Sequence, residues 1–205
     1  MRNYLVELIG TFFLVLVIGL SGDPIAIGCM LMVMVYMGGH VSGAHYNPAV
    51  TLGVLMRGKI GTKDGMMYML FQLIGALIAA YLYYLIKGEA FAPAPNAEIH
   101  ILKPIIVEAV FTFALVSVVL NVATHSKTEG NSYYGLAIGF TILAAAFAGG
   151  NISGGAYNPA VGTGPILVDM LTSGGSMGNL WIYLVGPFLG GAVAALVFKF
   201  INPDE

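Results

Sequence analysis

The chain has 205 residues, is 58% hydrophobic and only 9% charged, and carries a formal net charge of −2. A soluble domain has roughly 25% charged residues, so this composition excludes an ordinary water-exposed surface and predicts a surface that mostly faces lipid. No basic cluster suited to nucleic acid is present. The single cysteine, Cys29, excludes an intrachain disulfide and a cysteine-based metal cage.

Apolar stretches long enough to cross a membrane occur six times along the chain. A bilayer core about 30 Å thick needs roughly 20 apolar helical residues, and the stretches that fit are 3–21, 24–42, 66–87, 102–123, 132–150 and 179–201. The first does not read as a cleavable signal peptide, because Arg2 is its only early cation and the apolar run continues as a full span. The sequence therefore predicts an all-α membrane protein with six transmembrane helices.

Two copies of one Gly-rich stretch organise the chain. Residues 38–50 and 149–161 align without a gap at an offset of 111 residues and agree at nine of thirteen positions, which indicates an internal duplication. Asn is a strong N-cap and Pro is favoured at the first helical position, so each copy predicts a helix start. The two signatures are Asn47-Pro48-Ala49 and Asn158-Pro159-Ala160.

The helices that follow these signatures, about 47–56 and 158–170, are too short to cross a bilayer. We expect them to be re-entrant half-helices. Lipid does not tolerate irregular backbone, so the Gly-rich runs before them must lie inside the protein or line a watery cavity.

The distribution of cations predicts that both termini lie in the cytoplasm. Positively charged residues are favoured on the cytoplasmic side, where this orientation places six of the eight: Arg2, Arg57, Lys59, Lys63, Lys127 and Lys199, against Lys87 and Lys103 outside. Three spans, an odd number, separate the two signatures. A single channel domain, 1–205, is therefore expected to contain two inverted repeats, about 1–87 and 102–205, joined by the loop 88–101.

Inverted halves bring the two half-helix N-termini together near the membrane midplane. Each N-terminus carries about half a positive charge and several unpaired N–H groups. The amides of Asn47 and Asn158 are expected to act there as donors, with loop carbonyls of 40–46 and 151–157 as acceptors. Such a lining suits neutral hydrogen-bonding solutes and repels cations. The alternative, that each Asn only caps its own helix, is weakened by the duplication.

Glu7 and Glu108 are carboxylates inside predicted spans, at matching places in the two halves. They could form a proton relay or cation site, or they could accept hydrogen bonds from the backbone of the re-entrant loops. Their repetition favours the second interpretation. We therefore treat them as loop-supporting carboxylates.

Catalytic and metal-binding patterns are not expected. His40 and His45 flank the first signature, but the second copy has Asn151 and Ala156 at those positions, so we expect loop hydrogen bonds and no metal. No phosphate-binding loop, nucleophile–base set or carboxylate cluster appears, and neither an enzymatic activity nor a cofactor is predicted.

The chain resembles the aquaporin (major intrinsic protein) family over essentially its whole length. The doubled Asn-Pro-Ala signatures, the paired Glu7 and Glu108, and Gly186-Pro187 in the last span carry the resemblance. It implies six spanning helices with two half-helices, one pore in each protomer and a homotetramer.

One departure concerns the selectivity filter. The family usually has Arg directly after the second Asn-Pro-Ala, where this chain has Val161. The resemblance places the other filter positions at Ile27, Ala146 and Gly155, which together imply a wide apolar mouth. A narrow apolar constriction could instead stop flow by dewetting, and the sequence leaves this alternative open.

These observations predict a multi-pass protein of the plasma or inner membrane that conducts water and small neutral solutes such as glycerol. Two alternatives remain. Inverted repeats with broken helices also occur in secondary transporters, although only Glu7 and Glu108 could couple transport here. The second alternative is a non-conducting structural membrane protein.

Overall fold

The computed structural model describes residues 1–205 and contains helices and no strands. Six helices are long and apolar enough to cross a membrane, so the protein is an integral multi-pass membrane protein. These six are α1 (Arg2–Ser21), α2 (Pro24–Ser42), α4 (Thr62–Lys87), α5 (Leu102–Ala123), α6 (Tyr134–Ser153) and α8 (Leu180–Ile201).

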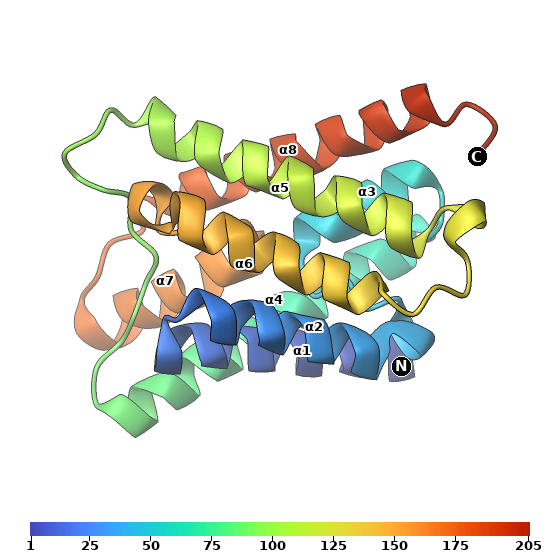
Figure 1. Cartoon of the computed structure of the whole chain (residues 1–205). Helices are drawn as coiled ribbons and strands as arrows, with labels where there is room; N and C mark the ends of the chain where they lie inside the picture. The colour runs from blue at the N-terminus through green and yellow to red at the C-terminus, as the bar shows by residue number, and fades with distance from the viewer.

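Two shorter helices complete the bundle. The half-helix α3 (Pro48–Arg57) has 10 residues and α7 (Pro159–Ser173) has 15. At 1.5 Å per residue they measure about 15 Å and about 22 Å, so neither crosses a bilayer alone. In Figure 1 they lie at opposite ends of the molecule, α3 near both chain termini and α7 near the linker 88–101. We call these two ends the terminal end and the linker end.

The long helices run alongside one another around the half-helices (Figure 1). Helix α1 packs on α4, and α5 packs on α8. A Cβ placed on Gly75 would lie 2.4 Å from Leu8 O, and one on Gly190 would lie 2.2 Å from Ala109 O. Any residue larger than glycine would push these helix pairs apart, which explains the small residues at the crossings.

Helices α2 and α6 contact each other through Gly28 and Gly139. Each glycine would bring an added Cβ to within 3 Å of the other's carbonyl oxygen, at 2.8 Å and 2.5 Å. These residues occupy equivalent positions in the two sequence copies. The closest contact between α2 and α6 is therefore a contact between equivalent residues.

Apolar side chains cover the outside of the bundle as well as its core. Phe147 on α6, Ile106 on α5 and Leu196 on α8 are each about 60% exposed, at 60%, 59% and 59%. Exposed apolar side chains of this kind, repeated on every long helix, are the surface that a bilayer requires. The core of the bundle also contains buried polar side chains, which belong to the candidate site.

Three expected boundaries differ clearly from the structure. Helix α4 begins at Thr62, before the expected start at 66, α6 runs to Ser153, beyond the expected end at 150, and α7 runs to Ser173, beyond the expected end at 170. The polar residues Lys63 and Asp64 suggested a turn, but an acidic residue in a first helical turn is favoured by the helix dipole. Tyr4 OH also donates to Asp64 Oδ1 at 2.5 Å, which ties this turn to α1.

Candidate functional site

Each half-helix begins at an asparagine whose side chain caps it. Asn47 Oδ1 accepts from Ala49 N at 2.8 Å, and Asn158 Oδ1 accepts from Ala160 N at 2.9 Å. Pro48 and Pro159 occupy the first helical positions, where a missing N–H costs nothing. Capping uses the amide oxygen and leaves both N–H groups of each side chain free to donate elsewhere.

The two asparagines tie the half-helices to each other. Asn47 Nδ2 donates to Tyr157 O and Asn158 Nδ2 donates to Tyr46 O, both at 2.9 Å. Each Nδ2 carries two protons, and one suffices for its contact. Because both asparagines line the same internal cavity, each has a second N–H available to a molecule in that cavity.

The tyrosines before the asparagines adopt an unusual backbone conformation. Tyr46 has φ 51° and Tyr157 has φ 48°, in the left-handed region that costs an L-residue about 1–2 kcal/mol. This turn aims each carbonyl at the opposite asparagine. The side chains are held as well, because Tyr46 OH donates to Met34 O and Tyr157 OH donates to Ala145 O, both at 2.9 Å.

Glu7 supports the first re-entrant loop from α1. Its Oε1 accepts from Ser42 Oγ (2.6 Å) and His45 N (3.0 Å). Its Oε2 accepts from Tyr46 N (2.7 Å) and Gln72 Nε2 (2.8 Å). The side chain is fully buried, and four donors satisfy the carboxylate without a cationic partner.

Glu108 holds the second loop from α5 in the same way. Its Oε1 accepts from Ser153 Oγ (2.7 Å) and Ala156 N (3.0 Å), and its Oε2 accepts from Tyr157 N (2.6 Å). The structure thus brings each predicted carboxylate to the loop of its own half. Each one stabilises a strained tyrosine by binding its backbone N–H.

Backbone carbonyls of both loops are available as acceptors. The oxygens of residues 43–45 and 154–156 accept no hydrogen bond within the protein. Ala44, His45, Gly155 and Ala156 line the cavity with the asparagines. A buried carbonyl without a partner is rare unless water or a ligand satisfies it, so the carbonyls that line the cavity are available to a molecule inside it.

The cavity around Asn47 and Asn158 is narrow and otherwise aliphatic. It offers about 20 Å³ to the centre of a water molecule, which is room for roughly one or two waters. Twelve of its sixteen lining residues are hydrophobic. Its aliphatic walls come from α1, α2, α5 and α6 through Leu14, Ile18, Leu31, Leu115, Val119, Ile138 and Ile142.

The four expected filter residues are not all at this cavity. Gly155 and Val161 line it, whereas Ile27 on α2 and Ala146 on α6 do not. Ile27 is nevertheless buried, at 9% exposure, and Ala146 is half-buried. Neither arginine of the chain lies at the cavity, because Arg2 begins α1 and Arg57 ends α3.

A larger cavity opens toward the terminal end. It offers about 370 Å³ to water and is lined by residues that include Asn3, Ser42, Lys59, Asp64 and Thr124. A neighbouring cavity of about 830 Å³ lies beneath the α5–α6 loop and contains His40 and His125. His40 and His45 are thus in separate cavities, and no group of three potential metal ligands occurs.

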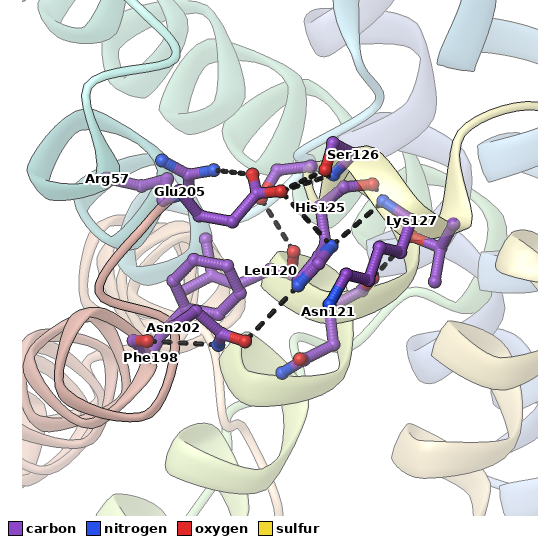
Figure 2. Close-up of polar contacts among 11 residues, drawn as sticks. Arg57, Leu120, Asn121, His125, Ser126, Lys127, Phe198, Asn202 and Glu205 are labelled. Atoms are coloured by element: carbon purple, nitrogen blue, oxygen red, sulfur yellow. Dashed lines mark hydrogen bonds and ion pairs between the residues drawn. The ribbon is translucent and has the colours of Figure 1, made fainter.

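A polar cluster joins three segments at the terminal end (Figure 2). Glu205 pairs with Arg57 of α3 at 2.7 Å and accepts from both the N–H and the hydroxyl of Ser126, in the 3₁₀ turn η1 (Ser126–Thr128). His125 Nδ1 lies 3.4 Å from Glu205, and the Arg57 guanidinium lies 4.8 Å from the Phe198 ring centroid. The cluster fixes the end of the half-helix and the α5–α6 loop to the chain after α8.

The groups of this cluster lower the pKa of the Glu205 carboxyl. The Ser126 hydroxyl, followed by the Ser126 N–H and the positive charges near it, holds the pKa of Glu205 below its ordinary value of 4.5. Glu205 is therefore ionised at neutral pH and remains so into mildly acidic solution. This cluster has no equivalent among the polar contacts of the linker end.

Several residues of the site were not predicted from the sequence. Gln72 Nε2 bridges Glu7 and Thr51 Oγ1 (3.0 Å), and Tyr68 OH donates to Ser42 O at 2.9 Å. In the second half, Tyr183 OH donates to Ser153 O at 2.6 Å. A buried Gln in an apolar span was the one available signal, since such a side chain needs hydrogen-bond partners.

Known proteins resemble this chain over its full length. The family model described as Major intrinsic protein matches residues 1–198. Aquaporin NIP1-4 of Oryza sativa is 35% identical, with 98% of this chain and 77% of the relative covered. Aquaporin Z of Rhodopseudomonas palustris is 31% identical over 99% and 94%. Glycerol uptake facilitator protein-like 6 of Lactiplantibacillus plantarum is 32% identical over the whole of both chains.

The fold also matches a solved structure, the aquaglyceroporin from Plasmodium falciparum. The TM-score is 0.85 at 24% sequence identity, and the match covers 98% of this chain and 97% of the other. Fold, re-entrant loops and sequence therefore agree. This chain belongs to the major intrinsic protein family.

Proposed function

We propose that this protein is a passive channel for water and small neutral solutes such as glycerol. The observation that carries the proposal is the meeting of the two half-helix caps at one apolar cavity, with an unused N–H on each asparagine. Relatives described as aquaporins and as a glycerol uptake facilitator support the same function.

The arrangement selects for neutral molecules by hydrogen bonding and by charge. A solute oxygen at the centre accepts from Asn47 Nδ2 and Asn158 Nδ2, and its hydroxyl protons are donated to free loop carbonyls on either side. The two half-helix N-termini present positive dipole ends to the same point. A cation there is repelled and finds no carboxylate, because Glu7 and Glu108 are occupied by loop donors.

We propose that Ile27, Ala146, Gly155 and Val161 surround the outer mouth of the channel. Three of these side chains are no larger than valine, and all four are apolar, so this mouth is wide and cannot donate to solutes. Exclusion of protons and ions then depends mainly on the half-helix dipoles. Introducing Val161→Arg adds a fixed positive charge and is expected to lower any proton leak in a pH-dye liposome assay. An equal leak in both proteins would refute this role.

We also propose an orientation in the membrane and an oligomeric state. The cation asymmetry of the sequence supports cytoplasmic termini, so the terminal end faces the cytoplasm. The chain then forms one channel domain of two inverted repeats, 1–87 and 102–205. The family relationship supports a homotetramer with one passage in each protomer, in the plasma or inner membrane.

The test is a permeability panel in liposomes that contain the purified protein. Stopped-flow light scattering is expected to show water and glycerol fluxes above those of empty liposomes. Their rates should rise linearly with the gradient and depend weakly on temperature. Saturable flux that follows an ion gradient would instead indicate a secondary transporter. Flux equal to that of empty liposomes would indicate a structural protein.

A further inference from the structure

The central cavity and the terminal-end cavity adjoin each other inside the bundle. The central cavity offers about 20 Å³ to water and the terminal-end cavity about 370 Å³. Two residues, His45 and Val119, line both cavities. The two cavities therefore meet at these two residues, and we call this junction the neck; His45 comes from the first re-entrant loop and Val119 from α5.

The His45 ring is locked in one orientation. Its Nδ1 lies 3.1 Å from Thr51 Oγ1, and its ring packs edge-on against Tyr68 with centroids 5.1 Å apart. Thr51 donates its only proton to Asn47 O at 3.1 Å and accepts from Gln72 Nε2 at 3.0 Å. The hydroxyl therefore accepts from His45, which places the ring proton on Nδ1.

This tautomer makes Nε2 of the neutral ring a bare acceptor. Nε2 makes no hydrogen bond within the protein, so it can accept only from a molecule in the passage. Val119, the other residue that lines both cavities, is aliphatic and 6% exposed. The neck thus combines one rigid acceptor with one apolar side chain, so a molecule that donates a proton to the imidazole there also contacts an aliphatic surface.

The outer mouth has the opposite character. Gly155 and Ala146 present no side chain beyond a methyl group, and Val161 replaces a long charged side chain of the family pattern. A site built from such small groups discriminates weakly by size. Size selection must then fall on the part of the passage where rigid walls approach each other most closely.

We propose that the neck between His45 and Val119 sets the size limit for solutes, and that Val119 is the residue that determines specificity. This inference rests on the channel function proposed above. It assigns the selective step to the terminal-end side of Asn47 and Asn158, and it leaves the outer mouth as a wide entrance. Molecules that carry a hydroxyl or amide donor in a narrow chain are the class that fits.

The test compares Val119→Ala with Val118→Ala, the same change one residue away at a position that lines neither cavity. Water, glycerol and erythritol permeabilities are measured in liposomes. Removing two methyl groups from a tight apolar site alters discrimination by roughly tenfold. We therefore expect Val119→Ala to raise the erythritol-to-water permeability ratio about tenfold and Val118→Ala to leave it unchanged.

A narrowing variant gives the second measurement. Val119→Phe is expected to lower glycerol flux more than water flux, whereas Val110→Phe, on the exposed face of α5, should alter neither. If the erythritol-to-water permeability ratio is unchanged in a conducting Val119→Ala protein but changes in Ile27→Ala, the neck does not set the size limit and selection occurs at the outer mouth. Absence of water flux in the unsubstituted protein would contradict the channel function itself.

Discussion

The two halves of the molecule anchor their re-entrant loops with partly different side chains. In both, a buried carboxylate binds a serine hydroxyl and two loop N–H groups, and a tyrosine OH binds the serine carbonyl. The first half adds Gln72 and Thr51, which continue the polar network to His45. The second half has Pro187 and Gly162 at the equivalent positions and ends its network at Glu108.

The two halves therefore share one anchoring arrangement and differ in the polar network around it. The shared parts hold the asparagines in place, since both loops need an anchor to keep a tyrosine in the left-handed conformation. The added polar network orients a ring at the terminal-end neck. In the second half, Tyr183 packs into the space that a residue larger than Gly162 would occupy.

The largest expected effect comes from neutralising the two anchors. Each oxygen of Glu7 accepts two donors, so in Glu7→Gln the amide NH₂ meets two donors whichever way it points. Glu108 Oε2 accepts only one, so the amide of Glu108→Gln can take that place. Bonds to charged groups contribute about 1.5–3 kcal/mol each. We expect Glu7→Gln to cost about 4 kcal/mol and Glu108→Gln about 2 kcal/mol.

These values can be compared by chemical unfolding of the purified protein in detergent micelles. Glu7→Asp and Glu108→Asp serve as controls that retain the charge but shorten the reach. Equal losses of unfolding free energy in the two Gln variants would show that the number of donors does not determine how much each carboxylate stabilises its loop.

A substitution at Gly162 tests how tightly α7 packs against Tyr183 of α8. A Cβ on Gly162 would lie 2.3 Å from Tyr183 Cβ, so Gly162→Thr, which copies Thr51 into the second half, forces α7 away from α8. Overpacking of this kind costs about 3 kcal/mol. The thermal unfolding temperature in micelles should fall, and Tyr183→Gly in the same protein, which removes the Cβ in the clash, should restore part of the loss. No change in unfolding temperature would mean that α7 adjusts freely.

Tyr68 and Tyr183 provide a matched pair with a smaller effect. Each hydroxyl donates to the carbonyl of the serine that ends a long helix, so Tyr68→Phe and Tyr183→Phe should each cost about 1 kcal/mol. The same unfolding assay measures both. Losses that differ by more than about 1 kcal/mol would break the equivalence of the two halves at this contact.

The smallest expected effect is confined to the terminal end. Because the pKa of Glu205 is lowered in the folded protein, its contribution to stability is present above its ordinary pKa and is lost as the pH falls through the folded value. Glu205→Gln should therefore lower stability slightly at neutral pH, and the two proteins should converge well below pH 4.5. A gap between them that persists in acid would show that the carboxylate charge is not involved.

Much of the fold was predictable because it depends on short-range patterns. Apolar length predicted the six spans, and the Asn-Pro caps predicted the starts of α3 and α7. The starts of α4 and the end of α6 were missed, because a polar first turn and a Gly-Gly-Asn run look irregular in isolation. Tyr4 on α1 holds the first turn of α4, and Gly154 ends α6 in the left-handed conformation typical of a helix C-terminus.

The site was predictable only in part. The doubled signature identified Asn47 and Asn158 as candidate donors, but their bonds to the opposite tyrosine carbonyls join residues more than 100 positions apart. The roles of Gln72, Thr51 and Val119 likewise depend on which helices meet at the loop. Sequence spacing within one helix carries no information about such contacts.

The proposed channel function requires a solute to bind between the two asparagines where the half-helices meet. An experimental density map of the protein in lipid tests it most directly. We expect an ordered water or glycerol oxygen about 3 Å from Asn47 Nδ2 and Asn158 Nδ2, within a continuous passage that narrows at His45 and Val119. Asparagine side chains turned away from any passage, or a closed apolar core in their place, would contradict it.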